Sequence, residues 1–164
     1  MSLSSLREYL DKNGVEYIVI SHSPAFTAQG IAAVAHVPGK ELAKTVVVKL
    51  DGELAMAVLP ASFHVDLGLL KSTTDAKTVA LASEEEFKDH FPECETGAMP
   101  PFGNLYGMNV FVDEGLSKDK EIATDPRRVT VVYPSPFETQ LLKSERTDAI
   151  ELALDRPCID VGHG

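Results

Sequence analysis

The chain has 164 residues, 44% of them hydrophobic and 24% charged, and its 15 Lys+Arg against 25 Asp+Glu give a formal net charge of −10. This length and composition predict one folded domain with a real core and argue against intrinsic disorder. The acidic balance argues against a protein that coats DNA or RNA and against docking on anionic lipid. No window of the sequence approaches the ~18 apolar residues of a membrane span, so we expect no membrane partner.

The first half of the chain predicts two short helices and three strands. Leu3, Leu6 and Leu10 share one helical face, and Asn13-Gly14 ends that helix. Asp51-Gly52 is a strong signal for a two-residue hairpin. The further elements expected here are a strand over residues 15–20, a short helix over 27–35, and the two antiparallel strands 45–50 and 53–59 that the hairpin joins.

The second half predicts alternating short elements and one long loop. Asp66 is a helix cap, and Ser83 with Glu86 has the spacing of a capping box. The Gly and Pro content of residues 93–107 indicates a loop. The remaining elements expected are strands over residues 78–82, 110–113 and 129–133, a helix over 137–143, and a tail over 147–164 that begins as a helix and ends loosely.

The predicted helices and strands do not alternate strictly along the chain as in βα units. The hairpin also brings an antiparallel pair of strands into the sheet. We therefore predict an α+β fold: a single compact domain over residues 1–164, with a mixed, largely antiparallel sheet or pseudo-barrel surrounded by helices. A doubly wound nucleotide-binding fold is disfavoured on the same grounds.

Cysteine content and the N-terminus indicate the compartment. Cys94 and Cys158 are too few for a disulfide scaffold, and free thiols in a reducing compartment are favoured over one bridge. Arg7 and Glu8 stand where the apolar stretch of a signal peptide would be. We expect a cytoplasmic protein.

Most familiar catalytic and binding motifs are missing. The sequence has no P-loop, dinucleotide fingerprint or nucleophile elbow. His90 and Cys94 are four residues apart, but two ligands do not make a zinc site, so we expect no metal and no cofactor. His22 is better explained as a solvated loop histidine than as a base, and Cys94 has no partner at a recognisable spacing.

Two features stand out as candidate parts of a catalytic or binding site. Lys44 directly precedes the apolar strand expected over residues 45–48, although a lysine at a strand entrance is most often merely solvated. The second feature is the stretch Gly97-Ala98-Met99-Pro100-Pro101-Phe102-Gly103. Its two prolines fix φ and remove two N–H donors, while the flanking glycines permit close backbone approach. This stretch is either a stiff ligand-binding loop or a rigid turn before the next strand.

At these two features the sequence resembles the YbaK/ProX family of aminoacyl-tRNA deacylases, which is similar to the editing domain inserted in bacterial prolyl-tRNA synthetases. The resemblance is strongest over residues 20–142. It rests on the order and separation of the stretches His22-Ser23-Pro24-Ala25-Phe26-Thr27, Ala43-Lys44-Thr45-Val46-Val47-Val48-Lys49, Val58-Leu59-Pro60, the 97–103 stretch, and Val110-Phe111-Val112-Asp113-Glu114-Gly115-Leu116.

The resemblance implies an enzyme, an aminoacyl-tRNA deacylase that holds the acceptor end of a mischarged tRNA. Lys44 would be the functional lysine, with the Gly97 and Ala98 N–H groups stabilising the oxyanion. Water assisted by the substrate's own ribose hydroxyl would cut the ester, without a protein nucleophile. The residues that it implies for substrate binding are Phe26, Thr45, Met99, Pro100, Pro101, Phe102 and Gly103.

The expected reaction is removal of a small wrong amino acid, most readily from proline tRNA, because a synthetase discriminates poorly against smaller isosteres. A synthetase or an elongation factor is a candidate further partner. The alternative is a non-catalytic module that binds a small molecule or aminoacyl-tRNA. The family often has a Gly or His before its next strand, whereas Ile122-Ala123-Thr124-Asp125-Pro126-Arg127-Arg128 has neither, so the amino acid preference of known branches cannot be transferred.

The acidic charge is concentrated in one half of the chain. Residues 1–82 carry 7 Lys+Arg and 8 Asp+Glu, whereas residues 83–164 carry 8 and 17. Lys44 thus lies in a nearly neutral half. This distribution predicts local, salt-sensitive contact with a tRNA end rather than the absence of a nucleic-acid substrate.

Overall fold

The computed structural model describes residues 3–21, 42–91, 101–117, 119, 121–124, 129–134, 147–150 and 153–154. Its helices are α1 (Leu3–Lys12), α3 (Leu67–Thr74), α4 (Glu84–Phe87) and α5 (Glu114–Ser117), with 3₁₀ turns η1 (Lys88–His90) and η2 (Gly103–Tyr106). Its strands are β1 (Ile18–Ser21), β2 (Ala43–Leu50), β3 (Glu53–Pro60), β4 (His64–Val65), β5 (Val79–Leu81), β6 (Asn109–Asp113), β7 (Glu121–Thr124), β8 (Val129–Pro134), β9 (Thr147–Ile150) and β10 (Ala153–Leu154).

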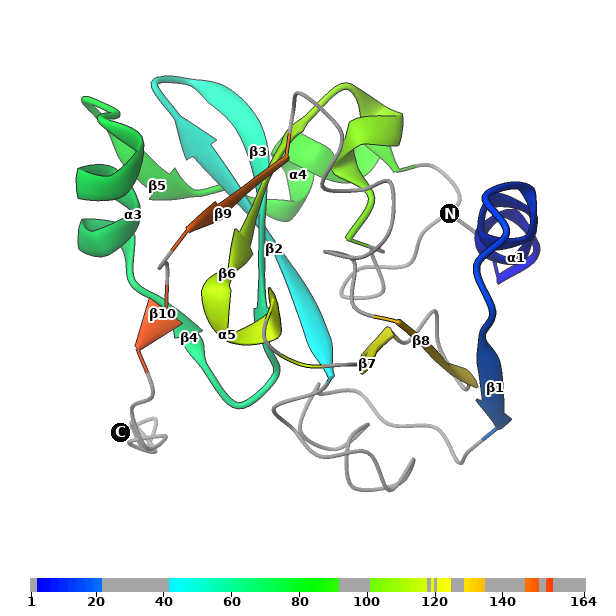
Figure 1. Cartoon of the computed structure of the whole chain (residues 1–164). Coiled ribbons are helices and arrows are strands. Elements are labelled where there is room, and N and C mark those ends of the chain that lie inside the picture. Colours follow the sequence, from blue (N-terminus) through cyan, green and yellow to red (C-terminus); the bar gives the residue numbers. More distant parts are fainter. Residues whose placement is uncertain are drawn as a thin grey trace, which may run out of the picture.

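A five-stranded mixed sheet in the order β5-β2-β3-β6-β9 forms the centre of the molecule (Figure 1). Strands β2, β3 and β5 pair antiparallel, whereas β6 pairs parallel with both β3 and β9. A three-stranded antiparallel sheet, β1-β8-β7, lies beside it, and β4 pairs with β10. The predicted α+β fold with a mixed sheet is confirmed.

The hairpin between β2 and β3 forms as its two turn residues predict. Asp51 has φ 51° and Gly52 has φ 86°, the positive values that a type I′ turn requires at both central positions. The Asp51 carboxylate also accepts hydrogen bonds from the Lys77 and Thr78 N–H groups, at 2.9 and 2.8 Å. The turn therefore anchors the start of β5 as well as joining its own two strands.

Alternation along β2 and β3 separates two hydrophobic clusters, one on each face of the sheet. On one face, Val47, Met56 and Val58 pack with side chains from α1, α4 and η2. On the other face, Val48, Ala57 and Leu59 pack against Leu70 of α3. We call these the α1 face and the α3 face.

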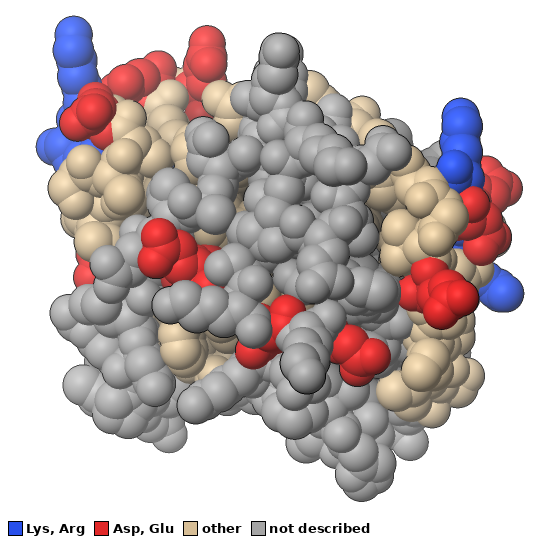
Figure 2. All heavy atoms as spheres, in the orientation of Figure 1, with Lys and Arg blue, Asp and Glu red and all other residues tan. Residues whose placement is uncertain are grey.

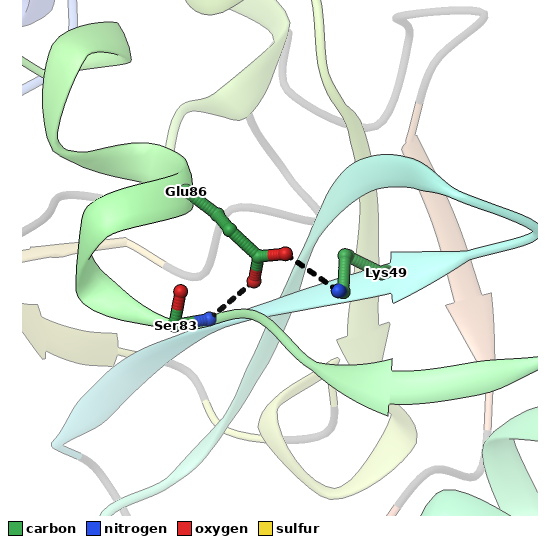
Figure 3. A network of polar contacts seen from close by, with 3 residues as sticks. All are labelled: Lys49, Ser83 and Glu86. Carbon is green, nitrogen blue, oxygen red and sulfur yellow. Dashed lines mark hydrogen bonds and ion pairs between the residues drawn. The ribbon is translucent and has the colours of Figure 1, made fainter.

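Helix α4 is tied to the central sheet by a polar network (Figure 3). Lys49 of β2 donates to Oε1 of Glu86 at 2.6 Å, and the Ser83 N–H donates to Oε2 of the same carboxylate at 2.7 Å. These contacts, the Lys49 bond first, lower the pKa of Glu86 to about 2. The capping-box prediction for Ser83 and Glu86 is thus confirmed, with a lysine from a distant strand added to it.

The structure also differs from the sequence predictions at several elements. The expected helix at the start of the 147–164 tail is wrong, because Thr147–Ile150 forms strand β9, paired parallel with β6. Backbone pairing with a neighbouring strand outweighs weak local preference in such a short segment. The expected loop over residues 93–107 contains the 3₁₀ turn η2, and the strands β4, β7 and β10 were not predicted. The predicted helices over residues 27–35 and 137–143 lie outside the described residues.

Within the described part of the chain, the helices are too short or too polar to cross a membrane.

Candidate active site

One end of the central sheet gathers several residues from the matched motifs. β2 begins where β3 ends, with Ala43 opposite Pro60 and Lys44 opposite Leu59. Because β6 runs parallel to β3, its last residue, Asp113, reaches the same end. We call this region, made of Leu42–Thr45, Leu59–Ser62 and Asp113, the lysine end of the sheet. Phe26 lies in the segment 22–41 that precedes Leu42, outside the described residues.

Lys44 and Thr45 lie on opposite faces at this end. Alternation puts the half-buried Lys44 on the α3 face with Val46 and Val48, next to the fully buried Leu59. Thr45, also half-buried, lies on the α1 face opposite Val58. A half-buried lysine can pack its aliphatic stem against apolar neighbours while its ammonium reaches the edge. The structure therefore gives Lys44 a more constrained place than a solvated surface lysine.

The end of the glycine-proline stretch is packed into the molecule. Pro101, Phe102 and Gly103 are all buried, and the Phe102 ring lies 5.0 Å from the ring of Tyr9 of α1. Phe102 is only 2% exposed, so it anchors the stretch in the core of the α1 face. Its predicted contact with substrate stays a prediction. Gly97, Ala98, Met99 and Pro100 lie outside the described residues.

Only glycine fits at position 103, because the central sheet lies too close to the backbone there for a side chain. A Cβ added there would lie 2.8 Å from Sδ of Met56 and 2.8 Å from Cγ2 of Val110. Val110 is a fully buried, β-branched residue of a central strand and has little freedom to move. Gly103 thus lets the backbone after the two prolines lie directly on the α1 face, the face of Thr45.

The candidate residues are therefore distributed over both faces of the sheet. The structure brings Thr45, Phe102 and Gly103 to the α1 face, and places Lys44 on the α3 face. A substrate that contacts both groups would have to bind at the lysine end, where the two faces meet.

Further polar groups lie close to Leu42, beside this end. The Leu42 carbonyl accepts a hydrogen bond from Ala61 N at 2.8 Å, and Leu42 also bridges Ala123 of β7 in parallel orientation. The residues that follow Ala61 and Ala123 in the sequence are Ser62 and Thr124. The hydroxyls of both are buried and have no hydrogen-bond partner in the described part of the structure. The sequence shows Thr124 only as part of a departure from the family pattern, because the short strand β7 that buries it has no clear local signal.

Asp113 is a buried carboxylate, 4% exposed, at the same end of the sheet. Its Oδ1 accepts a hydrogen bond from Gly115 N at 2.8 Å, which holds the turn into α5. Alternation places Asp113 on the α3 face with Phe111. Among the described residues, no three His, Cys, Asp or Glu side chains gather as metal ligands would.

A family model described as the aminoacyl-tRNA editing domain matches residues 22–133. The chain belongs to the aminoacyl-tRNA editing domain family. The match covers more than half of the chain and includes the lysine end, the glycine-proline stretch and β7. It confirms the resemblance found in the sequence, and it implies aminoacyl-tRNA as the substrate class. No curated protein sequence matches the chain.

Solved structures share the fold at low sequence identity. The hypothetical protein APE2540 is 20% identical with a TM-score of 0.76, covering 91% of this chain and 99% of its own. A protein described as a candidate trans-editing enzyme for prolyl-tRNA synthetase is 19% identical with a TM-score of 0.72, covering 94% and 99%. A candidate signal transduction protein from Marinobacter aquaeolei VT8 is 14% identical with a TM-score of 0.71, covering 94% of this chain but 31% of its own.

Proposed function

We propose that this protein hydrolyses the ester bond between a small, wrongly attached amino acid and a tRNA, most readily a proline tRNA. The observation that carries the proposal is the family match over residues 22–133, within which the lysine end of the sheet presents Lys44 and Thr45 from one strand. The likeness of the fold to a candidate trans-editing enzyme for prolyl-tRNA synthetase favours proline tRNA. We also propose a cytoplasmic location, because charged tRNA is present there.

In the proposed reaction, a water molecule attacks the ester carbonyl, and the ribose hydroxyl next to the ester assists it. The developing negative charge on the carbonyl oxygen needs fixed donors, for which we propose the Gly97 and Ala98 N–H groups. The Lys44 ammonium is a positive point charge that holds either this oxygen or the terminal phosphate. Collapse of the tetrahedral intermediate releases the free amino acid and leaves the hydroxyl on the tRNA.

The substrate-binding surface in this proposal includes Phe26, Thr45 and the residues 99–103. Of these, Thr45 lies on the sheet face to which Phe102 and Gly103 anchor the stretch. The buried Phe102 acts here through the position of the stretch, since its own surface is almost fully covered.

The test is a deacylation assay with the purified protein and proline tRNA charged with alanine, serine or cysteine. We expect faster loss of at least one of these amino acids than in buffer alone, while correctly charged prolyl-tRNA stays intact. No acceleration on any mischarged tRNA contradicts the proposal.

A binding module without chemistry is the second candidate. The observation that favours it is the occurrence of this fold as 31% of a longer chain described as a candidate signal transduction protein. Calorimetry with free amino acids, nucleotides and uncharged tRNA, run beside the deacylation assay, separates the two. Tight binding of one of these ligands together with no deacylation supports the binding module.

A further inference from the structure

The glycine-proline stretch runs directly into the 3₁₀ turn η2, which has an aromatic ring at each end. The Leu105 N–H donates to the Phe102 carbonyl at 3.0 Å, and the Met108 N–H donates to the Gly103 carbonyl, also at 3.0 Å. Because these main-chain bonds close the turn, they fix the place of Phe102 at its start relative to Tyr106 at its end.

Both rings contact aromatic side chains from other parts of the chain. The Phe102 ring lies 5.0 Å from that of Tyr9 in α1, and the Tyr106 ring lies 4.6 Å from that of Phe91, which directly follows η1. Both separations are within the range that aromatic pairs prefer. Phe102 is 2% exposed and Phe91 is 3% exposed, so both pairs belong to the core of the α1 face. The turn is therefore held from two sides.

The pair of Phe91 and Tyr106 joins the two flanks of the segment that contains Gly97 and Ala98. Phe91 is the last described residue before residues 92–100, and Tyr106 follows that segment within one short turn. Fixing the two ends of a segment to each other restricts the conformations open to the residues between them. This ring contact therefore bears on where the main chain between its partners can lie.

We infer that Tyr106 is a positioning residue for deacylation, which acts through its ring contact with Phe91 on the place of the Gly97 and Ala98 N–H groups. The inference rests on the proposed function, in which these N–H groups stabilise the oxyanion. Such donors act on the transition state, so their displacement lowers kcat and leaves KM for the charged tRNA nearly unchanged. A displacement of about 1 Å is enough for a loss on the order of 10²-fold.

The experiment measures kcat and KM with the mischarged proline tRNA that the wild type hydrolyses fastest. Tyr106→Leu keeps an apolar side chain but removes the ring, and we expect kcat to fall by about 10- to 100-fold at nearly constant KM. Tyr106→Phe keeps the ring and should retain a kcat close to that of the wild type. All rates are measured well below the melting temperature of each variant, so that loss of folded protein does not enter kcat.

Phe87→Leu is the matched control. The Phe87 ring also packs on Phe91, with ring centres 6.4 Å apart, and its side chain is buried as well. Both partners of this pair precede residue 92, so their contact does not join the two flanks of the segment. Phe87→Leu should lower the melting temperature while kcat stays near the wild-type value.

Phe91→Leu removes the same ring contact from its other side, and it takes the place of Tyr106→Leu if that variant does not fold. It should give a similar fall in kcat. The double variant should fall no further than either single variant, because both lose one shared contact.

A wild-type kcat in Tyr106→Leu and Phe91→Leu overturns the inference while leaving the deacylase intact. So does a fall in kcat for Phe87→Leu as large as that for Tyr106→Leu. Absence of hydrolysis by the wild type with every charged tRNA overturns the proposed function, and the inference falls with it.

Discussion

Lys44 is half-buried and lies at the start of the regular strand β2. Its Cα is fixed by the β2–β3 ladder, and its face is fixed by alternation with Val46 and Val48. A lysine on a fixed backbone can bring one positive point charge to the end of the sheet. The surroundings, rather than the residue type, distinguish it from the exposed lysines of the chain.

We expect Lys44→Ala to lower deacylation by about 10²–10³-fold, because a preorganised charge that stabilises an oxyanion is worth roughly that much. Lys77→Ala, at an exposed position, is the control and should retain full activity. Rates with serine-charged tRNA, together with the melting temperature of each variant, make the test. Unchanged activity in Lys44→Ala would remove Lys44 from the mechanism.

Close packing leaves no room for a side chain at Gly103. Gly103→Ala should destabilise the protein by about 1–3 kcal/mol, the usual cost of overpacking a core, because Val110 cannot move away from the added Cβ. Gly68→Ala in α3 is the comparison, since its added Cβ meets one side-chain oxygen, of Asp66, at 3.3 Å. Urea unfolding of both variants measures the difference, and a smaller loss for Gly103→Ala than for Gly68→Ala would contradict this packing argument.

At the scale of elements, α4 depends on one carboxylate that serves two partners. Glu86 accepts from the N–H that precedes its own helix and from Lys49 on β2. A capping contact fixes where the short helix begins, and the cross-link to β2 fixes where it lies. Four helical residues would not hold together without such contacts, because an isolated helix this short is unstable in water.

This contact makes part of the stability depend on pH. The pKa of Glu86 lies at about 2 in the folded protein and near 4.5 in an ordinary glutamate, so the unfolded chain binds the proton first as the pH falls. The stabilisation is therefore complete above about pH 5 and is lost as the pH falls towards 2.

We expect the melting temperature of Glu86→Gln to lie below that of the wild type at neutral pH and to approach it at low pH. Both melting curves, recorded from pH 7 to pH 2.5, test this. The neighbouring exposed Glu85 provides the control variant Glu85→Gln, which should show a smaller dependence of the difference on pH. Added salt should reduce the effect, since the pair is partly exposed. A constant gap between Glu86→Gln and the wild type across the pH range would rule out this linkage.

For the whole molecule, the charge distribution limits how tRNA can bind. The chain carries a net charge of −10, and Figure 2 shows Lys and Arg of the described residues at the margins of the face in view, with Asp and Glu between and beside them. A net charge this acidic disfavours an extended basic groove along a tRNA body. Contact with the acceptor end alone needs few phosphates.

Binding of tRNA should therefore depend only moderately on salt. We expect log Kd against log salt concentration to have a slope that corresponds to about one to three neutralised phosphates, taking roughly 0.7 per phosphate for a single-stranded end. Binding titrations between low and moderate salt measure it. A slope several times steeper would mean that the protein grips much more of the tRNA than its acceptor end.

Local signals in the sequence determined a large part of this fold. The turn at Asp51-Gly52, the cap at Asp66 and the capping box at Ser83 each act within a few residues, so their outcome does not depend on distant chain. The family resemblance, carried by the order of motifs along the chain, was likewise readable without coordinates and is confirmed by the family match.

Tertiary structure decided what depends on residues far apart in sequence. Strands β7 and β9 form because β2, β8 and β6 offer them partners, although their own sequences are short and weakly patterned. The burial of Thr124 follows from the pairing of β7, and the packing of Phe102 on Tyr9 joins two residues that lie far apart in the sequence. Sequence thus determined the local turns, caps and family, because these depend on near neighbours. Only the assembled sheets determined which side chains share a face, because register and burial are set between strands that the sequence keeps apart.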